Sequence, residues 1–209
     1  MKIVFTLVLP ALITLFAGCS KKAIEYTIEG IVRDESFGSK AAGTTVGLYQ
    51  FTPGTAGDPT FVTSAVTGAD GKYSFTFKRD KVEKYQLVFS KDNYFSSTQE
   101  FTVEDLDVKI PKLFLTGIHA KAWVRLRFVN PDSNGSVKIV KTNGKSGCDE
   151  CCSFSEFTLY PNVTDTSLYC INNGNSTYSY HWFRLQTSQN GEASVVTVPF
   201  DTTELVLNF

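Results

Sequence analysis

The chain has 209 residues, of which 42% are hydrophobic and 20% are charged, and its formal net charge is -1. This balance excludes the concentrated basic surface that binding to a nucleic-acid backbone requires, and it excludes the acidic tails typical of disordered segments. Aromatic residues make up 13% of the chain, and their abundance favours strands over helices.

Residues 1–18 have the layout of a secretory signal peptide. Lys2 supplies a positive start, an apolar run follows, and the small residues Ala17 and Gly18 precede Cys19. The apolar run is shorter than the ~20 residues that a membrane-spanning helix needs. This pattern resembles a bacterial lipobox. The resemblance implies cleavage before Cys19, lipidation of the Cys19 thiol and attachment of the protein to a membrane.

Residues 19–25 form a short polar tether after the signal peptide. Lys21 and Lys22 suit a spacer close to an anionic lipid surface. The acidic residues that surface-exported lipoproteins carry directly after the cysteine are absent from this sequence. We therefore expect an outer-membrane lipoprotein that faces the periplasm.

From Tyr26 onward the apolar pattern has a period of two, which is typical of half-buried strands. The Gly68 to Gly71 segment predicts a tight hairpin between two strands, and residues 79–84 are expected to form one helical turn. Strands are expected over residues 26–33, 44–51, 61–67, 72–78, 85–90 and 96–103 and within 108–115.

One stretch of the first half resembles a known family. Residues 67–75 read Thr-Gly-Ala-Asp-Gly-Lys-Tyr-Ser-Phe, after Glu-Gly-Ile-Val at 29–32 and Thr-Val-Gly-Leu-Tyr at 45–49. Together they are similar to the carboxypeptidase regulatory-like, or transthyretin-like, domains of Bacteroidota-type envelope lipoproteins. The resemblance covers residues 26–116 and implies a Greek-key β-sandwich without catalytic duty. The His-Arg-His site of hydrolases with the transthyretin fold does not carry over, because His119 is the first histidine of the chain.

The second half, residues 117–209, is also strand-like. Val124 and Leu126 fall on one face of its first strand, and Trp123, Arg125 and Arg127 fall on the other. Strand-like segments recur about every ten residues between Asn-Gly and Pro breaks, which predicts an immunoglobulin-like sandwich. We expect an all-β chain of two consecutive antiparallel β-sandwiches, transthyretin-like then immunoglobulin-like, with a short junction around residues 115–120.

Four cysteines, Cys148, Cys151, Cys152 and Cys170, lie close together in the second half. In an oxidising compartment an even set of cysteines most often forms structural disulfides. Adjacent cysteines rarely pair, so Cys170 is expected to pair with Cys151 or Cys152 and Cys148 with the other. Two alternatives remain: a zinc site, for which only one Cys-x-x-Cys knuckle is present, and a dithiol redox centre, whose thiol pKa the intervening acidic residues would raise.

Two aromatic groups are candidates for ligand binding. Tyr180 and Trp182 share one face of a predicted strand with Arg184, and Trp123 shares another with Arg125 and Arg127. Exposed aromatic rings stack on sugars, but a strand that points a Trp inward is also what a sandwich core needs. Both interpretations stay open at this point.

The sequence contains no nucleophile elbow, phosphate loop or His-Glu-x-x-His motif. We therefore expect no enzyme, no cofactor and no metal site, but an envelope lipoprotein that binds a protein partner or acts as a scaffold. The alternative functions are a carbohydrate-binding lipoprotein that uses the aromatic faces, and an enzyme whose site has no recognisable motif.

Overall fold

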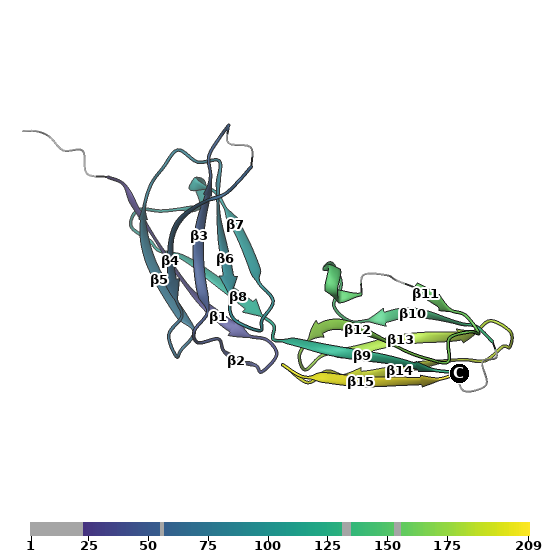
Figure 1. Cartoon of the computed structure of the whole chain (residues 1–209). Helices are drawn as coiled ribbons and strands as arrows, with labels where there is room; N and C mark the ends of the chain where they lie inside the picture. Colours follow the sequence, from purple (N-terminus) through teal and green to yellow (C-terminus); the bar gives the residue numbers. More distant parts are fainter. Residues whose placement is uncertain (1–22, 55–56, 131–134, 153–155) are drawn as a thin grey trace, which may run out of the picture.

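The computed structural model describes residues 23–54, 57–130, 135–152 and 156–209. The predicted signal peptide, Cys19 and most of the tether lie outside the described residues. The described part confirms the all-β class: it folds into two consecutive β-sandwiches, one formed by β1 to β8 and the other by β9 to β15 (Figure 1). In the ranges described, no helix has the length and apolar character needed to cross a membrane.

The first sandwich consists of two sheets. One has the order β2-β1-β5, with β8 also paired to β1, and the other has the order β4-β3-β6-β7. The strands of the first sheet are β1 (Glu25–Asp34), β2 (Ser39–Lys40), β5 (Lys72–Lys78) and β8 (Lys112–Ile118). Those of the second are β3 (Thr45–Phe51), β4 (Thr60–Val66), β6 (Lys84–Ser90) and β7 (Ser97–Phe101).

The core of the first sandwich follows from the period-two pattern. In β1 every second residue is buried, so Ile28 and Val32 point inward while Glu29 and Arg33 are exposed. The facing sheet contributes large side chains such as Phe89, which is fully buried. The alternating aromatic residues of β5 face the same core: Tyr73 and Phe77 are buried, and Phe75 packs against them half-buried.

The predicted hairpin at Gly68 to Gly71 is wrong. The turn itself is tight, because the amide of Gly71 donates to the carbonyl of Gly68 and Gly71 has a φ of 73°. However, β4 pairs with β3 while β5 pairs with β1, so the turn carries the chain from one sheet to the other. Turn chemistry fixes a local reversal of the chain, but it does not decide which strand becomes the partner.

The predicted helical turn at residues 79–84 is also wrong. The segment is an irregular connection, in which the amide of Arg79 donates to the carbonyl of Ile24 and the amide of Glu83 donates to that of Phe51. A short 3-10 helix, η1 (Val103–Asp105), follows β7 instead.

The second sandwich has sheets of order β12-β9-β15 and β11-β10-β13-β14. Its first sheet consists of β9 (Lys121–Val129), β12 (Asp165–Asn173) and β15 (Thr202–Asn208). Its second sheet consists of β10 (Val137–Asn143), β11 (Glu156–Leu159), β13 (Thr177–Arg184) and β14 (Asn190–Val196). A 3-10 helix, η2 (Asp149–Cys151), lies between β10 and β11.

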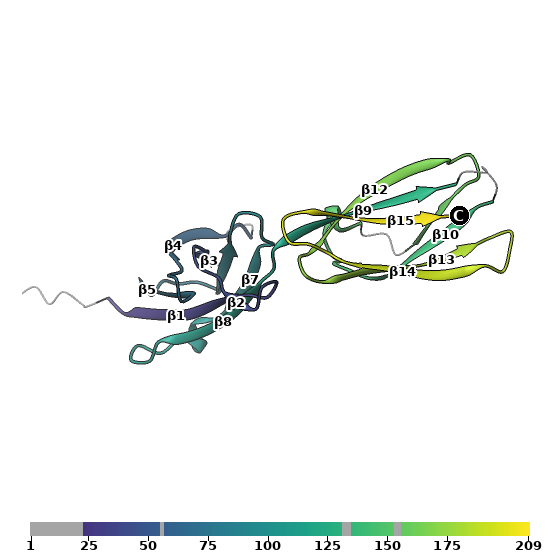
Figure 2. The ribbon, with the colours of Figure 1, turned by 90° about the horizontal axis from the view of Figure 1, so that it is seen from below.

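Each sandwich contains one parallel pair among otherwise antiparallel strands. β8 runs parallel to β1, and β15 runs parallel to β9. As a result, the first sandwich begins at the end that lies away from the second one, and the last strand runs toward the opposite end of the molecule (Figures 1 and 2).

The junction between the sandwiches is short and well bonded, because β8 ends at Ile118 and β9 begins at Lys121. Four loops meet there. The Phe200 ring stacks on Phe37 and packs edge-on against Tyr94, with ring centroids 5.9 and 5.5 Å apart. The side-chain amide of Asn175 donates to the carbonyl of Ser36 at 2.7 Å. These contacts connect the β1–β2 and β6–β7 loops of the first sandwich with the β12–β13 and β14–β15 loops of the second.

Candidate functional site

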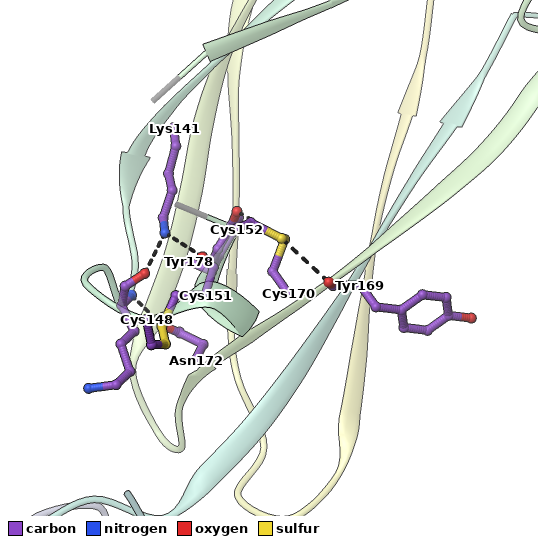
Figure 3. The surroundings of a disulfide bond; sticks show 9 residues. Lys141, Cys148, Cys151, Cys152, Tyr169, Cys170, Asn172 and Tyr178 are labelled. Atoms are coloured by element: carbon purple, nitrogen blue, oxygen red, sulfur yellow. Dashed lines mark hydrogen bonds between the residues drawn. A yellow bond between two sulfur atoms is a disulfide. The ribbon is translucent and has the colours of Figure 1, made fainter. Parts of the chain in front are cut away.

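The four cysteines form two disulfides, Cys148–Cys151 and Cys152–Cys170, which is one of the two pairings that the sequence left open (Figure 3). Cys148 is the N-cap of η2, and Cys152 follows the helix with a φ of 49°. This geometry sends the two neighbouring side chains in different directions, so each can reach its own partner. Among the described residues no cluster of three or more His, Cys, Asp or Glu side chains is arranged to hold a metal ion.

A half-buried lysine holds the disulfide loop against the sheet. The ammonium group of Lys141 donates to the carbonyls of Lys145 and Cys151 and lies 5.3 Å from the centre of the Tyr178 ring (Figure 3). Burial lowers the pKa of Lys141. The amide of Lys145 donates in turn to the side chain of Asn172, which is fully buried. The loop is therefore built as a structural element of the second sandwich.

Trp123, Arg125 and Arg127 share the outer face of β9, as the sequence predicted. The two guanidinium groups are already engaged. Arg125 donates to the Ser167 hydroxyl and lies 3.6 Å from Glu204, and Arg127 forms a two-point contact with Asp165. The hydrogen bonds and ion pairs of the two arginines link β9 to the neighbouring strands and stabilise this face of the sheet. The same guanidinium groups are exposed enough to contact a ligand.

Tyr169 is the residue of this face that sequence reasoning missed. It pairs with Arg125 in the sheet, is 59% exposed, and its ring lies 6.0 Å from the guanidinium carbon. Trp123 is the diagonal cross-strand neighbour of Tyr169, a spacing that aromatic rings can bridge. The alternating pattern of residues 165–169 indicates that Tyr169 points away from the core. Only the register of β12 on β9 places its ring beside Arg125.

The second aromatic candidate is wrong for Tyr180. Its side chain is only 1% exposed and belongs to the core, and Trp182 is half-buried against the same core. The core interpretation therefore holds for this face of β13. The opposite face carries His181, which lies 3.4 Å from Glu192, and Phe183, which is exposed.

A third surface, the outer face of the first sandwich, was not singled out by the sequence. Leu113 and Leu115 on β8 are 60% and 67% exposed, and Ile31 of β1 is paired with Leu115. We call these three residues the β8 stripe. The signal in the sequence was that residues 112–118 are apolar on both faces, which an ordinary half-buried strand is not.

Two hollows flank Ile31 along the β8 stripe. One, of about 440 Å³, is lined by Ile31, Leu113, Glu29 and Lys72 among others. The other, of about 420 Å³, is lined by Ile31 and Leu115 together with several charged side chains. The charged residues at its rim are Arg33, Glu35 and Lys40. The stripe is thus an apolar strip between two shallow hollows with rims of both signs.

Comparison with known proteins yields solved structures only. No protein-family model and no curated protein matches the chain. Among solved structures, it is similar to a 9R-lipoxygenase from Cyanothece (11% identity, TM-score 0.34, 46% of this chain and 18% of that chain). It is also similar to the Bacillus anthracis TIE protein (12% identity, TM-score 0.37, 88% of this chain and 34% of that chain).

The third similarity covers most of both chains. The shaft pilin SpaA from Lactobacillus rhamnosus GG is 9% identical with a TM-score of 0.35, over 90% of this chain and 98% of that chain. At these identities and TM-scores the three likenesses carry no argument about the family or the function of this chain.

Proposed function

We propose that the protein is a non-catalytic envelope lipoprotein, anchored in the outer membrane by Cys19 and facing the periplasm, that binds a protein partner through the β8 stripe. The observation that carries the partner is the pair of exposed leucines, Leu113 and Leu115, which lie beside Ile31 on the outer face of the sheet. Large aliphatic side chains exposed side by side mark interaction surfaces when their rim is polar.

The hollows on the two sides of Ile31 specify the chemistry of the partner. Side chains that point to the same side of an extended segment are about 7 Å apart, so a strand can place two of them on one surface. The partner is an extended protein segment with two apolar side chains, one for each hollow. Charged groups on that segment meet the rim residues, Lys72 beside one hollow and Glu35 beside the other.

A photo-crosslinking experiment tests the partner. The crosslinking amino acid benzoylphenylalanine replaces Leu113 in cells, and Val66, equally exposed on β4 of the other sheet, serves as the control position. We expect an adduct of one defined mass from position 113 and none from position 66. Leu115→Lys in the same chain should abolish the adduct, and an adduct that survives this change contradicts the proposal.

Palmitate labelling tests the anchor. Cells that express the full chain are labelled, and Cys19→Ser is the control. We expect label on the unaltered chain and none on the variant. Label that remains on the variant removes the anchor from the proposal.

Carbohydrate binding is a second candidate, favoured by the exposed Tyr169 ring beside Trp123 and Arg125. Aromatic rings offer apolar faces for sugar rings, and a guanidinium group can bond hydroxyl groups. In a glycan array Trp123→Ala and Tyr169→Ala should each abolish binding. Tyr160→Ala, which removes an exposed ring from β11–β12, should leave binding intact. Binding that is unchanged in the first two variants removes this candidate.

A further inference from the structure

The end of the first sandwich that lies away from the junction presents aliphatic side chains to solvent. Val108 and Ile110, in the loop before β8, are 63% and 67% exposed, and Ile24, just before β1, is also exposed. Since β1 and β8 run parallel and pair from Ile28 with Lys112, both segments lie at the same end (Figure 2). We call Ile24, Val108 and Ile110 the aliphatic tip.

The loop that carries the tip is an ordered turn. The Asp107 carboxylate accepts hydrogen bonds from the amides of Lys109 and Ile110 at 2.6 and 3.1 Å. The Asp107 side chain closes the turn, and Val108 and Ile110 point outward from it, away from the core. Val108 and Ile110 are therefore exposed by an ordered turn.

Charged side chains of both signs surround the tip, because the exposed acidic residues Glu25, Asp80 and Asp107 lie among four cationic ones. Lys109 stands between the two aliphatic residues, and Lys78, Arg79 and Lys81 follow at the end of β5, which runs antiparallel to β1 and so ends at this tip. All four are exposed. Aliphatic residues with interspersed lysines and arginines are the composition that binds at the interface of a lipid bilayer.

We propose that the aliphatic tip rests on the lipid bilayer, with Val108 and Ile110 in its interfacial layer. This inference rests on the proposed lipidation of Cys19. Only residues 20–24 separate Cys19 from β1. A fully extended chain spans at most about 3.5 Å per residue, so the tether holds this end within about 20 Å of the membrane. The tether thus keeps the aliphatic tip close to the bilayer, which is the surface that we expect the tip to contact.

Fluorescent probes on matched positions test the contact. Val108→Cys and Val66→Cys are each labelled with the polarity-sensitive dye NBD. Both side chains are 63% exposed. Val66 lies at the end of β4, at the junction end of the first sandwich, because the turn after it hydrogen-bonds to Val32 of β1. Each full-length lipidated protein is reconstituted into vesicles of phosphatidylethanolamine and phosphatidylglycerol. We expect NBD emission at position 108 to rise severalfold and to be quenched by nitroxide-labelled lipid, while position 66 keeps its emission in water.

The outcomes separate this inference from the anchor. Palmitate on Cys19 with equal emission at positions 108 and 66 overturns the contact and leaves the anchor in place. A chain without palmitate overturns the anchor and the contact together. An emission rise that requires native membranes assigns the tip to a protein partner, and a rise that grows with the protein-to-lipid ratio assigns it to a second copy. Either result overturns the bilayer contact.

Discussion

Gly30 lies beneath a tyrosine ring on the neighbouring strand. In the register of β1 on β5 it pairs with Tyr73, and a Cβ atom at Gly30 would lie 2.5 Å from the Tyr73 ring. The ring is buried and also packs against Phe75 and Phe89, so it cannot turn away freely. A residue with any side chain at this position must displace part of the core.

Gly30→Ala should therefore lower the free energy of unfolding by about 1–3 kcal/mol, the usual cost of overpacking. Urea denaturation measures it. Gly68→Ala is the matched control, because Gly68 has no positive φ and its nearest neighbour would be an exposed Asp70 oxygen at 3.3 Å. Equal denaturation midpoints for the two variants would contradict the role of the Tyr73 ring.

Buried tyrosines make the stability of the second sandwich sensitive to alkali. Burial raises the pKa of Tyr178 to about 12, and the same cause raises the pKa of Tyr180. A folded-state pKa above the unfolded value means that the contribution is complete below about pH 10 and is lost as the pH rises toward the folded value. Stability should thus fall between about pH 10 and pH 12.

Between about pH 10 and pH 12, Tyr178→Phe should lose roughly 2 kcal/mol less of its free energy of unfolding than the unaltered protein, because the variant has no phenol to ionise at this position. Urea midpoints at neutral and alkaline pH measure it. Tyr160→Phe changes an exposed tyrosine and should keep the slope of the unaltered protein. A Tyr178→Phe slope equal to that of the unaltered chain would refute the assignment.

At the scale of single elements, the two disulfides differ in how much chain they close. Cys152–Cys170 joins residues 18 apart and ties η2 to β12, whereas Cys148–Cys151 joins residues 3 apart. The entropy that a crosslink removes from the unfolded chain grows with the length of the closed loop. The longer bridge should therefore stabilise the fold more than the shorter one.

Replacing Cys152 and Cys170 together by Ala should cost about 3 kcal/mol, and replacing Cys148 and Cys151 together should cost less than about 2 kcal/mol. Chemical denaturation of the two double variants measures the difference. A larger loss from the second pair would show that the short bridge, and the Lys141 contacts beside it, hold more of the structure than loop length implies.

Strands could be predicted from the sequence and their partners could not. The period-two pattern located β1, β5 and β9, because burial of alternate residues is a local property. The hairpin at Gly68 failed because pairing is a long-range choice. The same limit explains the site residues: Trp123 lies on the predicted face, but Tyr169 joins it only through strand register.

The β8 stripe was missed for a related reason. The sequence shows that both faces of residues 112–118 are apolar, but nothing local shows that Phe114 is buried while Leu113 and Leu115 are exposed. Only the register of β8 on β1, which pairs Leu113 with Glu29 and Leu115 with Ile31, places the two leucines on the outer face. Tyr180 shows the opposite error, since an aromatic residue chosen as a ligand contact is buried in the core.

At the scale of the whole molecule, the junction determines how far the two sandwiches can move against each other. The Phe200 ring contacts two loops of the first sandwich, and Lys145 places its ammonium group 4.2 Å from the Phe95 ring. Backbone bonds add to these contacts, since Gly174 donates to Ala120 at 2.8 Å. Because the linker is short and the junction is held by contacts on several sides, the angle between the two sandwiches should vary over a narrow range.

Phe200→Ala should widen the distribution of angles between the sandwiches without unfolding either one. Small-angle X-ray scattering measures the distribution of molecular dimensions, and near-ultraviolet circular dichroism monitors the folding of each core. Phe61→Ala removes an equally prominent exposed ring far from the junction and should leave the scattering curve unchanged. Identical curves for Phe200→Ala and the unaltered chain would show that the ring does not hold the junction.

The two parallel pairs have a mechanical consequence. A pull between the start of β1 and the end of β15 enters β1 at its first residue and leaves the first sandwich through the last residue of β8, its parallel partner. It then enters β9 at its start and leaves through the end of β15. In both sandwiches the force is directed along the paired strands, so their hydrogen bonds are loaded together in shear and cannot open one at a time.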